Sequence, residues 1–205
     1  MGRNNARTRR VREVNELQWH KFSLASQGKV HYPLAMSEEL EKFWSADKEL
    51  SVDPDWKRRE KDEFVRLVSP LDINGVTVEG LRFTVSAHIY MPDRSVTFQI
   101  EYESVQHPKG VPMVRFEWRP RSPHNNKGLG PLEYRYIALT GTHIHPFDLN
   151  WAYSQNQVRK GNLPIAVPVQ QEIGSYDEAL AFVETKFRIK GVTGIPAPPW
   201  TSKMI

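Results

Sequence analysis

The sequence predicts an α+β fold, in which helical segments pack on a twisted antiparallel sheet of about five strands. Apolar and polar residues alternate with a period of two over three successive segments between residues 76 and 119, and short turns join these segments. Helix start signals lie on both sides of this region. At 205 residues, 11% of them aromatic, the chain can also bury a sizeable core.

Composition divides the chain into three parts. We expect residues 1–12 to form a flexible basic arm, because they carry five arginines before the first acidic residue: Arg3, Arg7, Arg9, Arg10 and Arg12. Removing these five from the 28 Lys and Arg leaves 23 against 24 Asp and Glu, so the positive charge is concentrated in the arm. We expect residues 13–70 to form a helical segment packed on the body, and residues 71–205 to form the sheet, a C-terminal helix and a Pro-rich tail.

Two helix starts are predicted within residues 13–70. Ser37 is a suitable N-cap, because two glutamates follow it and apolar residues then recur at helical spacing. The pair Asp53-Pro54 places a capping acid before a proline at the first helical position. This second signal predicts a helix that ends near Leu67 and exposes a mostly charged face.

The alternating segments predict an antiparallel meander. Its three strands centre on residues 81–89, 96–102 and 114–118, and Gly80 marks a change of phase that predicts a β-bulge. A fourth strand is predicted from Tyr134 to Gly141 and a fifth from Leu163 to Val169, where two prolines favour a sheet edge. The final helix follows a capping box that begins at Ser175.

The sequence also excludes several activities. The absence of cysteine rules out disulfides, Cys-ligated zinc, iron–sulfur clusters and a thiol nucleophile. No Walker-type phosphate loop, dinucleotide fingerprint, Gly-x-Ser-x-Gly elbow or His-Glu-x-x-His zinc helix occurs. No apolar stretch approaches the roughly 18 residues of a membrane span, and the arm has no signal-peptide core. We therefore expect a cytoplasmic protein with no membrane partner.

The densest group of chemically capable side chains lies between His124 and Asn150. His143 and His145 alternate on a predicted strand, so they share one face at a spacing of about 6–7 Å along the strand. Two imidazoles at that spacing can hold a divalent metal ion, and Asp148 would complete a set of two histidines and one carboxylate.

A metal-free alternative is general acid–base cleavage of RNA. His143 or His145 would act with His124, which lies in the Gly-rich loop of residues 120–131, and Asp148 would support them. A cation of that loop would stabilise the phosphorane. The purely structural interpretation is that the histidines lie on a strand surface, while Asp148 and Asn150 cap a turn after Pro146.

The leading functional hypothesis is a nucleic-acid-binding accessory or regulatory protein. The arm would bind phosphates together with cations in and beside the loop, namely Arg119, Arg121 and Lys127. Tyr90 or Trp118 would stack on bases, and the arginines of the polar sheet face would either track phosphates or pair with glutamates across strands. The alternatives are a small His-based ribonuclease or metal-dependent nuclease, and a protein-interaction module of a larger assembly.

Overall fold

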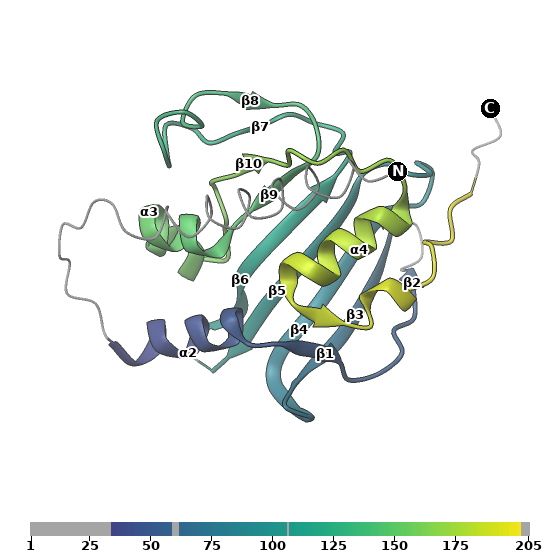
Figure 1. Cartoon of the computed structure of the whole chain (residues 1–205), viewed down its shortest axis with the longest axis horizontal. Helices are drawn as coiled ribbons and strands as arrows, with labels where there is room; N and C mark the ends of the chain where they lie inside the picture. The colour runs from purple at the N-terminus through teal and green to yellow at the C-terminus, as the bar shows by residue number, and fades with distance from the viewer. Residues whose placement is uncertain (1–33, 59–61, 106, 202–205) are drawn as a thin grey trace, which may run out of the picture. The chain divides into compact units, whose positions relative to one another are not determined.

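A long, mostly antiparallel sheet forms the framework of the protein (Figure 1). The computed structural model describes residues 34–58, 62–105 and 107–201. Among these residues, nine strands form one sheet in the order β10-β9-β6-β5-β4-β3-β1-β11, with β2 paired to β3, and β7 and β8 form a second sheet. The described residues from Ala35 onward belong to one compact unit.

The meander supplies the four longest strands. The strands of the large sheet are β1 (Lys48–Leu50), β2 (Lys57–Arg58), β3 (Phe64–Ile73), β4 (Val76–His88), β5 (Val96–Ser104), β6 (His107–Trp118), β9 (His143–His145), β10 (Val167–Pro168) and β11 (Ile189–Lys190). The small sheet contains β7 (His124–Asn125) and β8 (Ala138–Leu139). The predicted antiparallel meander is confirmed, although the sheet is wider than five strands.

The core lies between the apolar face of the meander and α4 (Tyr176–Phe187), which lies across the sheet in Figure 1. Phe83 of β4 contacts Phe187 with ring centroids 6.4 Å apart, and Phe116 of β6 contacts Phe182 at 4.7 Å. Each such aromatic side chain removes a large apolar area from water, which is the main stabilising contribution. Two further helices, α2 (Leu34–Ser45) and α3 (Phe147–Arg159), and the short 3₁₀ helix η1 (Val192–Gly194) complete the described elements.

The predicted capping box at the start of α4 is confirmed. The backbone N–H of Glu178 donates to Ser175 Oγ at 3.2 Å, and the Glu178 carboxylate accepts from the backbone N–H of Gly174 at 2.7 Å. Both bonds satisfy backbone donors at the helix entrance. Ser175 is the N-cap as predicted, whereas the reciprocal bond of Glu178 goes to Gly174, one residue before the cap.

Of the two helices predicted within residues 13–70, the second, which would begin at Asp53-Pro54, is a wrong prediction. Within the described residues of this segment, Lys57–Arg58 form β2, and β3 begins at Phe64, inside the predicted helix. In β3, Val65, Leu67 and Leu71 are buried, whereas Arg66 and Val68 face solvent. This alternation, with its period of two, determines the local structure, and the Asp-Pro capping signal does not. The first helix is confirmed, but it begins at Leu34, before Ser37.

Three expectations for the second half of the chain also need correction. Of the predicted strand from Tyr134 to Gly141, only β8 is a strand, and it belongs to the small sheet. Of the predicted strand from Leu163 to Val169, only β10 is a strand, although it does lie at the sheet edge as the prolines indicated. The segment after Pro146 forms α3 instead of a turn, with non-helical backbone angles at Ser154.

The polar sheet face is occupied by cross-strand ion pairs. Arg82 of β4 contacts Glu101 and Glu103 of β5, so its guanidinium is already paired. Trp118 cannot stack on bases, because its side chain is fully buried and donates to the carbonyl oxygen of Ile173 at 3.0 Å. Within the described part of the chain, no helix has both the length and the apolarity to span a membrane.

Gly80 produces the predicted irregularity in the β3–β4 ladder. Its φ is +80°, and the register of the two strands shifts opposite it, between Pro70 and Asp72. A Cβ at this position would collide with the carbonyl oxygen of Glu103. Glycine is therefore required here for two reasons, the left-handed backbone and the close approach of β5.

We predict that Gly80→Ala lowers the free energy of unfolding by about 2 kcal/mol or more, because both strain and collision oppose the new methyl group. Gly75→Ala is the matched control, since Gly75 also has a positive φ, +73°, but open space around its Cβ position. Its expected cost is about 1 kcal/mol. Urea unfolding of both variants measures the difference, and equal costs would contradict the importance of the β5 contact.

Candidate metal centre

Three histidines from two separate segments converge at the β9 end of the sheet. His143 and His145 lie on β9 and His124 lies on β7, and one ligand atom of each lies within 4.8 Å of the others. The ring centroids are 5.4 Å apart for His124–His143, 4.7 Å for His124–His145 and 5.2 Å for His143–His145. The structure thus places the loop histidine against the strand pair, as the acid–base hypothesis required.

Strand register explains the position of the β9 histidines. β9 pairs antiparallel with β6, so that His143 lies opposite Glu117 and His145 lies opposite Arg115. Residues that are paired across a ladder project from the same face, and Phe116 between them points to the core and α4. The four polar side chains therefore lie on the sheet face opposite α4.

Backbone carbonyls fix the orientation of each imidazole. His143 Nδ1 lies 2.8 Å from the oxygen of Gly141, and His145 Nδ1 lies 2.7 Å from the oxygen of Leu163. His124 Nε2 lies 2.9 Å from the oxygen of Pro164. Only a protonated nitrogen can donate to a carbonyl, so in each neutral ring the other nitrogen carries a lone pair. This arrangement is how proteins orient histidines that ligate metals.

The free nitrogen of His143 has no hydrogen-bond partner. His143 and His145 are 0% exposed, and His143 Nε2 is a buried polar atom that makes no hydrogen bond. A buried polar atom left unsatisfied costs about 1–3 kcal/mol, which makes such atoms rare in native proteins. A ligand at this position would remove that cost.

Glu117 places a carboxylate beside the two strand histidines. Its Oε1 lies 3.4 Å from His145 Nε2, and its Oε2 lies 3.6 Å from His143 Nε2. Arg115 Nε lies 3.1 Å from Oε1. Burial raises the pKa of Glu117, but the contact with His145, which is protonated at low pH, and the charge of Arg115 outweigh it and hold the pKa at about 2. The carboxylate is therefore ionised at neutral pH.

Burial also keeps the strand imidazoles neutral. It lowers the pKa of His145 to about 4, despite the opposing contact with Glu117. It lowers the pKa of His143 as well, against the opposing effect of the hydrogen bond to Gly141. Neutral imidazoles are metal ligands, whereas a general acid must be an imidazolium at working pH. The strand imidazoles are therefore suited to binding a metal ion or to acting as a general base, but not to acting as a general acid.

Two buried asparagines hold the segment that accepts the histidine hydrogen bonds. The Asn150 side chain donates to the oxygen of Ile165 at 2.7 Å and accepts from its N–H at 2.8 Å. The Asn126 side chain makes the same pair of bonds to Ala166, at 2.9 and 2.8 Å. Each side-chain amide thus makes the two hydrogen bonds that a neighbouring strand would otherwise make to that residue. The interpretation of Asn150 as a turn cap is wrong, because its buried side chain holds Ile165 instead.

Asp148 takes no part in the group of three histidines. It lies in the first turn of α3, where it is exposed and hydrogen-bonds to the side chain of Trp44. The carboxylate that lies beside the histidines belongs instead to Glu117. The period-two pattern of β6 placed Glu117 on a polar face, but nothing in the sequence indicated that β9 would pair with β6.

The predicted phosphate-binding cations have different environments. Arg121 and Lys127 are exposed in the segment that carries His124. Arg119 is half-buried, because its guanidinium packs on the ring of Trp118 at 5.0 Å and donates to the oxygen of Gly174 at 3.0 Å. The five arginines of the arm, Arg3, Arg7, Arg9, Arg10 and Arg12, lie outside the described residues.

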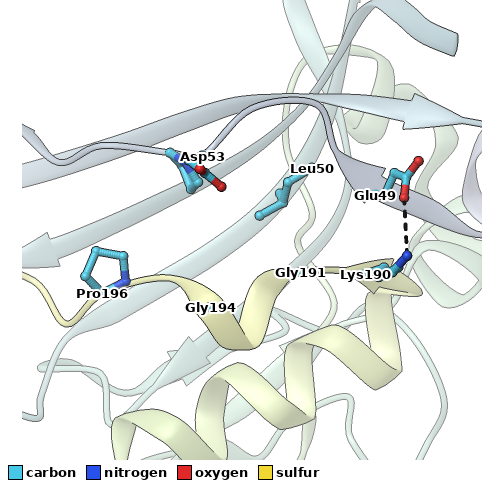
Figure 2. Close-up of a pocket in the computed structure, with 8 residues that line it drawn as sticks. Glu49, Leu50, Asp53, Lys190, Gly191, Gly194 and Pro196 are labelled. Carbon is cyan, nitrogen blue, oxygen red and sulfur yellow. Dashed lines mark ion pairs between the residues drawn. The ribbon is translucent and has the colours of Figure 1, made fainter. Parts of the chain in front are cut away.

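A separate pocket lies at the opposite edge of the sheet, lined by residues of β1 and β11 and of the segments that follow them (Figure 2). Glu49 and Lys190, which are paired in the β1–β11 ladder, form an ion pair at 3.8 Å on one side of it, and Leu50 and Pro196 also line it. It contains no histidine and no group of metal-ligating side chains. The histidine cluster is therefore the stronger candidate for chemistry.

We predict that Asn150→Ala lowers the free energy of unfolding by about 3 kcal/mol, because it leaves the buried N–H and C=O of Ile165 without partners. Asn125→Ala is the control, since Asn125 is exposed and only accepts from the N–H of Lys127. It should cost less than about 1 kcal/mol. Urea unfolding in the presence of a chelator measures both, and a similar small cost for Asn150→Ala would show that the amide bonds contribute little.

The chain matches no known family model, and neither curated proteins nor solved structures include a significant match. The chemistry of the site is therefore the basis on which its function can be assigned.

Proposed function

We propose that this protein binds a divalent transition-metal ion through His124, His143 and His145 and uses it to hydrolyse phosphodiester bonds. The observation that carries the proposal is the convergence of three imidazoles, each with one nitrogen bonded to a backbone carbonyl and the other left as a lone pair. Three histidines are a common ligand set of catalytic zinc sites, which keep a further position for water or substrate.

The surroundings of the histidines support a catalytic site more than a purely structural one. His143 and His145 are fully shielded from solvent, but the side chains of Arg115 and Glu117 beside them are each 24% exposed. Solvent therefore reaches the border of the cluster. A divalent ion at such a border lowers the pKa of a bound water and supplies a hydroxide nucleophile near neutral pH.

Exposed cations favour an anionic substrate. Arg121 and Lys127 lie in the same segment as His124, three residues before it and after it. Phosphate groups of a nucleic acid could contact both side chains, since neither guanidinium nor ammonium is buried. A nuclease is accordingly the form of hydrolase that we propose, acting in the cytoplasm.

We predict that the purified chain binds Zn²⁺ or Co²⁺ with one-to-one stoichiometry, and that binding weakens as pH falls because protons compete for the imidazoles. Replacing His124, His143 or His145 by Asn should each lower the affinity at least tenfold and abolish cleavage of oligonucleotides. Isothermal titration and a cleavage assay measure the two effects.

His107→Asn is the control for these variants, because His107 lies at the start of β6, outside the three-histidine group. It should leave metal binding unchanged. Retention of full metal affinity in all three cluster variants would disprove the proposed site. Metal binding without any cleavage would retain the site and reject the nuclease.

Nucleic-acid binding without catalysis is the second candidate function. It is favoured by the exposure of Arg121 and Lys127 and by the five arginines of the arm. In this case, the protein would be an accessory or regulatory component, and a protein partner in a larger assembly would also be compatible with it.

We predict that deletion of residues 1–12 weakens binding to a fluorescent oligonucleotide and reduces the slope of log affinity against log salt, because fewer counterions are released. Fluorescence anisotropy at several salt concentrations measures both quantities. Arg94→Gln, a single cation in the turn between β4 and β5, serves as the control. An unchanged salt slope after deletion would exclude the arm from binding.

A further inference from the structure

We infer that Glu117 supplies an oxygen ligand to the metal ion, so that the site consists of three histidines and one carboxylate. This inference rests on the proposed metal function of the histidines. It assigns to Glu117 the role that the sequence pattern suggested for Asp148, whose side chain lies outside the group.

The first support is the way in which Glu117 faces the histidines. Its two carboxylate oxygens approach His145 Nε2 at 3.4 Å and His143 Nε2 at 3.6 Å. Both Nε2 atoms carry lone pairs, because the Nδ1 atoms donate to carbonyl oxygens. Three electron-rich groups thus meet in a shielded space. Such an arrangement is unfavourable unless a cation lies among them.

Arg115 does not fill that position. Its Nε contacts the carboxylate of Glu117, and its Nη2 lies 3.5 Å from Nδ1 and 3.4 Å from Nε2 of His145. Similar distances to both ring nitrogens place the guanidinium over the imidazole, rather than along one lone pair. Moreover, Nε2 of His143 still has no partner. Arg115 therefore balances and orients the carboxylate, while the space between carboxylate and imidazoles remains suited to a metal ion.

The second support is the position of Glu117 relative to solvent. Its side chain is 24% exposed, whereas the two strand histidines are fully buried. The carboxylate is thus the most accessible of these three groups. A small anion that enters from solvent would meet Glu117 before the strand histidines, and would have to displace it to bind the metal. Glu117 would then act as an internal competitor for the open coordination position.

Azide binding to the Co²⁺-loaded full chain tests this inference. The informative variant is the double substitution Glu117→Gln with Arg115→Gln, because it removes the carboxylate and its counter-charge together and leaves the net charge unchanged. Glu117→Gln alone would leave Arg115 unpaired, and that charge would attract azide by itself. Glu133→Gln, at an exposed position, is the control for a lost carboxylate.

If Glu117 is a ligand, the double variant should bind azide at least tenfold more tightly than the wild-type chain. The visible absorption of Co²⁺ without azide should also change in Glu117→Gln and stay unchanged in Glu133→Gln. Thermal melting of the metal-free variants checks that they fold. If the double variant does not fold, the Co²⁺ spectrum of Glu117→Gln, which conserves side-chain size, still tests the inference.

Equal azide affinity and an unchanged Co²⁺ spectrum would overturn the inference and leave the three-histidine site intact. Failure of the wild-type chain to take up Co²⁺ at the histidines is a different result. It would overturn the metal function itself, and with it the role of Glu117.

Discussion

The candidate site depends on hydrogen bonds from side chains to the backbone of residues 163–166. His145 bonds the carbonyl of Leu163 and His124 that of Pro164, while Asn150 and Asn126 bind both polar groups of Ile165 and Ala166. This segment runs beside β9 without being a strand, so its backbone groups would otherwise be buried without partners. The same bonds set the tautomers of the two imidazoles. The hydrogen bonds that hold this segment in place are therefore also the ones that orient His124 and His145.

The buried polar groups at this end of the sheet lower the stability of the fold, and the apolar core has to offset their cost. Removing two imidazoles and most of a carboxylate from water is costly, and the core on the α4 face offsets that cost. The polar face contributes less, because Arg115 and Glu117 gain only a partly screened attraction. A buried nitrogen without a partner, His143 Nε2, is tolerable in a fold that has a large aromatic core on its other side.

The local patterns in the sequence predicted the meander, the shared face of His143 and His145, the irregularity at Gly80 and the cap of α4. Each of these depends on neighbours in the chain. The pairing of β9 with β6 could not be predicted, because 24 residues separate Trp118 from His143 and no local signal determines which strand accepts β9. For the same reason Glu117 was not identified. The Asp53-Pro54 signal failed because the pairing of β2 with β3, and of β3 with β4, overrides a local preference for helix.

The short edge strand β10 has a consequence for how this protein can diversify. Pro168 removes an N–H from the outer edge and Pro164 precedes it, so a further strand cannot easily add there. The end of the molecule that carries the histidines is therefore built from loops attached by side chains. Residues 127–137 lie between β7 and β8, outside the large sheet, so substitutions there leave the register of the meander unchanged. The rigid strands and the more variable loops are thus separated at the boundary between β9 and the small sheet.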